Sequence, residues 1–161
     1  MNALSPSMEF QIREAGPSDL EEILAHRRLM FFDMGYRDES ALESMIRHSR
    51  PGIRKYLADG SYRGWFAVSP NGQVAAGAGL IITSLVSGPL RPEQTSRPYL
   101  LNVYTYPQFR KMGLARRLTE QAIAYCRKEN FGILWLHASE YGRSLYESLG
   151  FIPTNEMKLM L

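Results

Sequence analysis

The segment from Tyr99 to Lys128 constrains the fold of this chain more than any other. The run Tyr99 to Thr105 predicts a strand, and helical spacing of apolar residues predicts a long amphipathic helix over 110–128. A helix that begins just after a strand carries unpaired backbone N–H groups and a positive dipole end, and together these form an anion site. Gly113, near the start of the helix, would let a phosphate approach the main chain. The segment therefore predicts an α/β architecture with an anion-binding turn.

Two helical regions precede this segment. The first opens at Pro17-Ser18-Asp19, where Ser18 and Glu21 have the spacing of a capping box, and it ends near Gly35. The second carries Leu42, Met45 and Ile46 at helical spacing. Proline disrupts the middle of a helix, so we expect a break at Pro51 and a separate short helix through Tyr56 and Leu57.

Strand patterns surround these helices. The expected strands are residues 8–13, 65–68, 74–85, 99–105 and 133–138, with a last one through Met157, Leu159 and Leu161. Gly77 and Gly79 indicate close packing or a bulge within the third of these strands. A short helix over 142–149 precedes the last strand, and Gly150 is its expected C′ residue. The order β-α-α-β-β-β-α-β-α-β predicts a mixed sheet flanked by helices.

Composition narrows the class of protein. With 161 residues, 45% of them hydrophobic, the chain has the size of a single domain over 1–161, in which we expect 1–7 to be flexible. The net charge of +3 suits an anionic small ligand, and the absence of a dense basic run argues against a nucleic-acid partner. Cys126 is the one cysteine, and His26 and His48 lack partners at metal-ligand spacing, so no disulfide and no metal site is expected. No membrane span or secretory signal is visible, which favours a cytoplasmic protein.

A second motif stands downstream, Leu145-Tyr146-Glu147-Ser148-Leu149-Gly150-Phe151. With it, the chain resembles the GNAT superfamily of acyl-coenzyme A-dependent N-acetyltransferases. Arg110-x-x-Gly113-x-Ala115 is similar to that family's coenzyme A motif, and Leu145 to Phe151 is similar to its L-Y-E-x-x-G-F helix. The resemblance implies an α/β (α+β) fold with a mixed, mostly antiparallel twisted sheet, splayed central parallel strands and flanking helices.

The resemblance also assigns roles to residues. Acetyl-CoA would be the cofactor, with its pantetheine arm lying between the strands 99–105 and 133–138 as an added strand. Tyr146 would be the general acid that protonates the leaving thiolate, a role that suits a phenol. The expected contacts to the cofactor are Val103, Tyr104, Thr105, Arg110, Lys111, Met112, Gly113, Leu114, Ala115, Ser139 and Arg143.

Several assignments have alternatives. Tyr146 would also be explained as an aromatic residue packed on an amphipathic helix, and Arg143 as a solvated surface charge. Leu101 stands where many relatives carry a carboxylate, so the general base is open among His137, Asp33 and water. The acceptor pocket would be built from residues 31–36 and 84–97.

The sequence as a whole predicts an enzyme that transfers acetyl from acetyl-CoA to a small-molecule or peptide amine in a ternary complex. One alternative is a non-catalytic module that senses acyl-CoA, although a sensor has no need of a thiolate-protonating tyrosine. A second is a nucleotide-binding protein with a different phosphate loop, which a turn with a single glycine disfavours. Exposed edge strands would allow a homodimer, and neither the oligomeric state nor the acceptor amine follows from the sequence.

Overall fold

The computed structural model describes residues 9–161 of the chain. The first strand was expected to begin at Met8, which lies outside these residues, as does the segment 1–7. The helices and strands are, in chain order, β1 (Gln11–Glu14), η1 (Pro17–Asp19), α1 (Leu20–Asp33), α2 (Glu39–Asp59), β2 (Tyr62–Val68), β3 (Val74–Ser84), β4 (Ser96–Thr105), η2 (Pro107–Phe109), α3 (Leu114–Lys128), β5 (Trp135–Leu136) and α4 (Arg143–Ser148).

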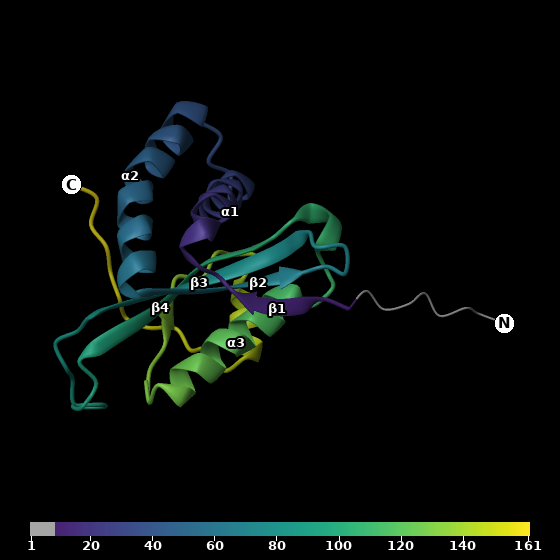
Figure 1. Ribbon diagram of the computed structural model, residues 1–161. Helices are drawn as coiled ribbons and strands as arrows, with labels where there is room; N and C mark the ends of the chain where they lie inside the picture. The colour runs from purple at the N-terminus through teal and green to yellow at the C-terminus, as the bar shows by residue number, and fades with distance from the viewer. Residues whose placement is uncertain (1–8) are drawn as a thin grey trace.

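The strands form one five-stranded sheet in the order β1-β2-β3-β4-β5. Neighbouring strands are antiparallel except for β4 and β5, which run parallel. Helices α1 and α2 lie on one face of the sheet and α3 lies on the other (Figure 1). This is the mixed, mostly antiparallel sheet flanked by helices that the sequence predicts.

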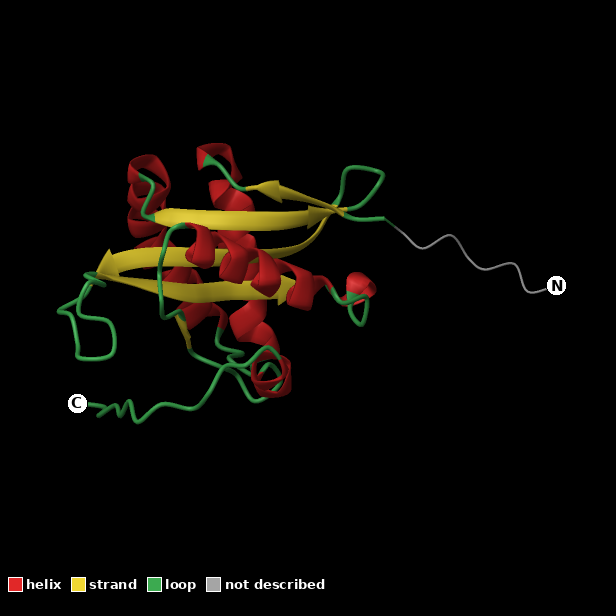
Figure 2. Ribbon diagram, turned by 90° about the horizontal axis from the view of Figure 1, so that it is seen from below, coloured by secondary structure: helices red, strands yellow, loops and turns green. Residues whose placement is uncertain are grey.

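The parallel pair lies at the edge of this sheet, because no strand forms among residues 149–161. The prediction of a final strand through Met157 and Leu161 is therefore wrong. Its alternating pattern is real, but β5 is only two residues long and offers the tail almost no ladder to extend. Residues 149–161 instead run without helix or strand to the C-terminus (Figure 2).

Two hydrophobic cores fill the two faces of the sheet. The core under α3 combines alternate strand residues such as Trp65, Leu80 and Leu100 with Leu114 and Leu118 of the helix. The core under α1 and α2 is built from the opposite faces of the strands and from the apolar stripes of these two helices; it consists of Leu20, Ile23, Leu24, Ile53, Leu57, Tyr62 and Phe66. Alternation along each strand thus supplies both cores from one sheet.

Helix α2 corrects the expected break at Pro51, because it runs unbroken from Glu39 to Asp59. The proline ring removes one backbone N–H, yet its fixed φ suits a helix. Pro51 is exposed, so water can solvate the carbonyl that loses its partner. Leu42 and Ile53, on either side, are both buried and hold the two halves as one helix.

Two other elements differ in extent from the expectation. Helix α3 begins at Leu114 rather than at residue 110, because Lys111 and Gly113 take positive φ angles of 63° and 74° that no helix accommodates. Strand β5 covers only residues 135–136 of the expected 133–138. Gly150, by contrast, has the positive φ, 91°, that its predicted place after the last helix demands.

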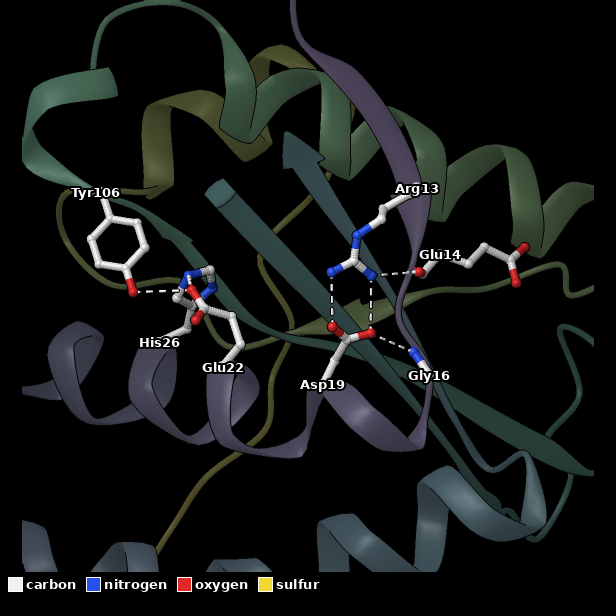
Figure 3. Close-up of polar contacts among 7 residues, drawn as sticks. All are labelled: Arg13, Glu14, Gly16, Asp19, Glu22, His26 and Tyr106. Atoms are coloured by element: carbon white, nitrogen blue, oxygen red, sulfur yellow. Dashed lines mark hydrogen bonds and ion pairs between the residues drawn. The ribbon is translucent and has the colours of Figure 1, made fainter. Parts of the chain in front are cut away.

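The turn into α1 is held by Asp19, not by the predicted Ser18 and Glu21 capping box (Figure 3). The Gly16 amide donates to Asp19 Oδ2 at 2.8 Å, and Arg13 donates to both carboxylate oxygens at 2.9 and 2.8 Å. The Arg13 hydrogen bond is the main reason that the pKa of Asp19 lies below its ordinary value. These hydrogen bonds connect β1 to the start of α1.

Gly77 and Gly79 confirm the prediction of close packing within β3. A Cβ on Gly79 would lie 2.1 Å from the hydroxyl oxygen of Tyr62, and one on Gly77 would lie 2.6 Å from His26 Nδ1. Tyr62 and His26 are 4% and 1% exposed, so neither ring has room to move away. Both glycines therefore let side chains from elsewhere in the fold touch the backbone of β3.

This packing predicts that Gly79→Ala destabilises the protein by about 1–3 kcal/mol, the usual effect of overfilling a close-packed core. Urea denaturation measures the free energy of unfolding of the variant and of the wild type. Gly88→Ala is the matched control, because a Cβ there would meet nothing within 4 Å. Equal stability of the Gly79 and Gly88 variants would contradict the packing argument.

Among residues 9–161, none of the helices combines the length and apolar character that crossing a membrane requires. Within the same residues, no three histidine, cysteine, aspartate or glutamate side chains come together as a metal-binding group. Cys126 is buried in the core under α3, as its place on the apolar face of that helix predicts.

Candidate active site

Strands β4 and β5 meet only briefly and then separate. Tyr99 pairs with Trp135 and Leu100 with Leu136, but β4 continues to Thr105 while β5 ends at Leu136. Within the described residues, the edge of β4 over 101–105 that faces away from β3 therefore has no strand beside it. Unpaired backbone groups along a strand edge are the feature that an extended ligand can use as an added strand.

A bulge in β4 marks the point where the strands part. Gly77 pairs with Tyr104 and Gly79 with Leu101, so Asn102 and Val103 together stand opposite one residue of β3. Asn102 has a φ of 53°, in the left-handed region that asparagine tolerates better than most residues. A bulge of this kind bends the strand and sharpens its twist.

Buried polar contacts hold this bulge. Asn102 is 4% exposed, and its Oδ1 accepts a hydrogen bond of 3.0 Å from Arg27 of α1. Arg27 also donates through Nε to Ser49 of α2 at 3.3 Å, and burial lowers the pKa of its guanidinium. Sequence reasoning missed this pair, although an asparagine within the apolar run of β4 was a signal.

The turn between β4 and α3 presents free amides. No hydrogen bond from the backbone N–H groups of residues 111–116 to another part of residues 9–161 is present. Gly113 precedes the first residue of α3, and a Cβ built on it would meet nothing within 4 Å. Open space in front of unpaired amides at a helix start is suited to a phosphate group.

The motif suggests that Arg110 contacts the cofactor, whereas in the structure its side chain contacts other residues of the chain. Its guanidinium forms an ion pair with Asp33 at the end of α1, and its Nε donates to the Thr105 carbonyl at 3.1 Å. The guanidinium carbon also lies 5.8 Å from the centre of the Tyr104 ring. Arg110 thus ties α1 to the end of β4, and Asp33, a candidate base, is engaged by this arginine.

Tyr146 of α4 packs against the core under α3. Its half-buried ring packs against the core that contains Leu114, and its centroid is 5.8 Å from that of Phe151. Burial raises the pKa of the Tyr146 phenol to about 12. A bond of 2.5 Å from Arg116 to Ser148 Oγ also fastens α4 to α3.

The turn before α4 explains the glycine at position 142. A Cβ there would come within 2.9 Å of Tyr146 Cε2, so the glycine makes room for the ring. Ser139 Oγ accepts a hydrogen bond of 3.2 Å from the Gly142 amide, which uses this side chain to shape the turn. Arg143 is exposed and lies 3.8 Å from Glu147, so in this structure it is a surface charge.

The remaining candidates are His137 and the aromatic residues near the end of α1. His137 is exposed just beyond β5. Among the residues expected to line an acceptor pocket, Phe31 and Tyr36 stack edge to face at 5.5 Å, and Arg37 covers the ring of Phe32 at 3.9 Å. These aromatic rings contact one another and their neighbouring arginines at the end of α1.

One polar cluster in this region was not expected (Figure 3). Tyr106 donates a hydrogen bond of 3.0 Å to Glu22 Oε1, and burial, reinforced by this carboxylate, raises the pKa of the phenol to about 12. His26 Nε2 also lies 3.0 Å from Glu22, although it is not aligned for a hydrogen bond, and burial lowers the pKa of the imidazole. The cluster joins α1 to the residue after β4. The i, i+4 spacing of Glu22 and His26 was its one signal in the sequence.

Comparisons with known proteins show the family to which the chain belongs. Residues 21–151 match the model of the acetyltransferase (GNAT) family. A GCN5-related N-acetyltransferase from Ralstonia eutropha has 35% sequence identity and a TM-score of 0.90, over 95% of this chain and 99% of that one. The search of curated proteins finds no match.

More distant structures share the fold. A predicted acetyltransferase from Clostridium acetobutylicum, solved with acetyl-CoA, is 22% identical with a TM-score of 0.81, over 95% of this chain and 96% of that one. Glucosamine-6-phosphate N-acetyltransferase from Arabidopsis thaliana is 18% identical with a TM-score of 0.64, over 95% and 98%. The chain belongs to the GNAT acetyltransferase family, whose members use acetyl-CoA.

Proposed function

We propose that this protein is an N-acetyltransferase of one domain that transfers acetyl from acetyl-CoA to an amine by direct attack in a ternary complex. The observation that carries the proposal is the row of unpaired amides over 111–116 beside the unpaired edge of β4. The first feature is suited to a pyrophosphate and the second to an amide-containing arm. These two groups occur together in coenzyme A.

The residues present fit this cofactor. The backbone of Val103, Tyr104 and Thr105 would pair with the pantetheine arm, because this edge of β4 has no strand beside it. The amides from Lys111 to Ala115 would hold the pyrophosphate, and Gly113 leaves it room to approach. Bound acetyl-CoA would supply an acetyl group activated as a thioester.

Tyr146 is the proposed general acid. Its phenol keeps its proton at neutral pH, because burial raises the pKa to about 12. When the amine attacks, the Tyr146 hydroxyl would donate its proton to the departing sulfur, which must leave as a thiol. Gly142 supports this role by making room for the ring.

Ser139 and Arg143 are also proposed to contact the cofactor, in addition to the backbone groups of β4 and of the start of α3. The Ser139 hydroxyl already accepts from the Gly142 amide, and it retains its own proton for a further hydrogen bond. Arg143 would have to leave Glu147 to reach a phosphate, and the exposed pair is weak enough to allow this.

The attacking amine must lose a proton, and three routes were open. Asp33 is held by Arg110, which makes it a poor base in this arrangement. His137, exposed beyond the point where β4 and β5 separate, and a water chain are the remaining routes. We propose no single base among them.

Thermal melting with acetyl-CoA, CoA and ATP in parallel tests the cofactor. Ligand at about 100 times its Kd stabilises the folded state by about 2.7 kcal/mol, which raises the Tm of a chain of this size by at least about 5 °C. We expect this shift with both CoA forms and none with ATP. No shift with either CoA form would mean that the turn at Gly113 is only the start of a helix.

Thiol release with a panel of amines then separates an enzyme from the alternative, a module that only senses acyl-CoA. A sensor would bind acetyl-CoA and release no CoA with any amine. The proposed enzyme releases CoA with at least one amine, at a rate that depends on the amine concentration.

A further inference from the structure

An arginine beside the β4–β5 pair lies against two aromatic rings. Arg97, near the start of β4, places its guanidinium carbon 5.5 Å from the centre of the Tyr99 ring and 5.2 Å from that of Trp135. Tyr99 and Trp135 form one of the two residue pairs that join these strands. Stacking on two aromatic faces restrains the planar guanidinium and orients its donors before any ligand arrives.

The donors of Arg97 are only partly used. Its NH2 group forms an ion pair with Glu156 of the C-terminal tail. Its Nε is buried and has no hydrogen-bond partner among the described residues. These two donors lie on one edge of the guanidinium, which matches a carboxylate or a phosphate that accepts from both. A buried donor without a partner is rare in folded proteins, and here it leaves half of a bidentate site unsatisfied.

Arg97 lies near the gap between β4 and β5 in which acetyl transfer is proposed. Leu100 packs in the core under α3, so by alternation Tyr99 and its partner Trp135 face the opposite side of the sheet, away from α3. The strands separate after the next pair, Leu100 and Leu136, and Leu101, on the same face as Tyr99, lies about 7 Å further along β4. An anion on Arg97 would thus be several ångströms from the gap in which acetyl transfer is proposed.

We propose that Arg97 binds an anionic group, a carboxylate or a phosphate, carried by the amine acceptor, and that Glu156 occupies this arginine until the acceptor displaces it. The inference rests on the proposed acetyl transfer and names the class of acceptor: a molecule with its reacting amine and an anion separated by several bonds. Glu156 is more than half exposed and belongs to a tail without secondary structure, so it can leave. Its exchange for a substrate anion preserves the charge balance at Arg97.

Direct binding is tested first, without any turnover. Inorganic phosphate and acetate are titrated separately, and the emission of Trp135 reports the change at Arg97, over a constant background from the buried Trp65. We expect Glu156→Gln to bind at least one of these anions several times more tightly, because the competing carboxylate is gone. Arg97→Gln should lose the response.

Arg63→Gln is the matched control. Arg63 also pairs with a glutamate, Glu14, at 3.0 Å and lies 5.3 Å from the centre of an aromatic ring, that of Tyr125. It differs from Arg97 in lying on β2, away from the β4–β5 pair. We expect this variant to bind both anions as the wild type does.

Acceptors in matched pairs test the substrate class. Lysine is compared with cadaverine, which lacks the carboxylate, and glucosamine 6-phosphate with glucosamine. We expect the wild type to prefer the anionic member of one pair, which identifies the source of the anion. In Arg97→Gln the KM for that member should rise roughly ten- to a hundredfold, as expected for a lost charge-assisted contact, with little change in kcat. Arg97→Lys should recover part of this lost affinity, because a lysine keeps the positive charge but lacks the paired donors of the planar guanidinium.

Two results would overturn the inference. One is a wild type without preference for the anionic member of either pair. The other is a Glu156→Gln variant that loses stability and binds neither anion more tightly, which would mean that the ion pair only anchors the tail. Failure of the acetyl-transfer proposal is distinct, because it would appear as absent acetyl-CoA binding in the wild type. Melting with acetyl-CoA also verifies that each Arg97 variant is folded.

Discussion

Replacing Tyr146 by phenylalanine is expected to lower kcat by about 10²–10⁴-fold, the usual contribution of a positioned general acid. The ring keeps its packing against Phe151 and beside Gly142, so only the hydroxyl group is lost. Because the pKa of the phenol is raised to about 12, the wild-type group is protonated throughout the neutral range, and the loss should be similar from pH 6 to pH 9. Thiol release under saturating acetyl-CoA and amine measures it.

The control is Tyr141→Phe, five residues earlier, where the side chain is 84% exposed. This variant should turn over at the wild-type rate. The affinity of Tyr146→Phe for acetyl-CoA, followed by melting, should change little. A Tyr146→Phe enzyme with unchanged kcat would show that the tyrosine is a packing residue, the alternative that its place on an amphipathic helix suggests.

Gly113→Ala is expected to weaken acetyl-CoA binding by roughly ten- to a hundredfold, because two effects combine at one position. The backbone φ of 74° is strained for any residue with a Cβ, by about 1–2 kcal/mol. The new methyl group would also occupy the open space in which a phosphate must approach the amides. Relief of the strain would reorient the free N–H groups at the start of α3.

Gly72→Ala separates these effects. Gly72 has a φ of 83° in the turn between β2 and β3, and a Cβ there also meets nothing within 4 Å. Both variants should lose similar stability in urea, but only Gly113→Ala should lose affinity for acetyl-CoA in a direct titration. Equal affinities in the two variants would exclude the turn at Gly113 as the phosphate site.

Local patterns were sufficient for much of this fold. Periods of two and of about 3.6 residues predicted most of the strands and helices over residues 9–148, because the burial of one face of each element fixes its pattern. Gly150 was also predictable, since few other residues take its backbone conformation at low strain. The two motifs together identified the family, which the comparisons confirm.

The wrong predictions concern segments whose structure depends on contacts with residues far away in the chain. Pro51 should break an isolated helix, but buried residues on both sides keep α2 whole. The tail has the alternation of a strand, but an edge strand of two residues gives it no partner. In both cases the local preference of the sequence does not decide the structure, because the deciding contacts come from elsewhere in the chain.

The candidate site divides in the same way. A glycine before a helix, a tyrosine in a known motif and the strand before them can be recognised from neighbouring residues, because their backbone conformations and spacing are local properties. The bulge held by Arg27 and Asn102, the pairing of Arg110 with Asp33, and the stacking of Arg97 on Tyr99 and Trp135 join residues far apart in the chain. Such contacts exist only once the sheet has assembled, because side-chain direction, burial and charge partners are set by packing. The chain thus encodes its family locally, while the environment of each charged side chain is a property of the folded molecule.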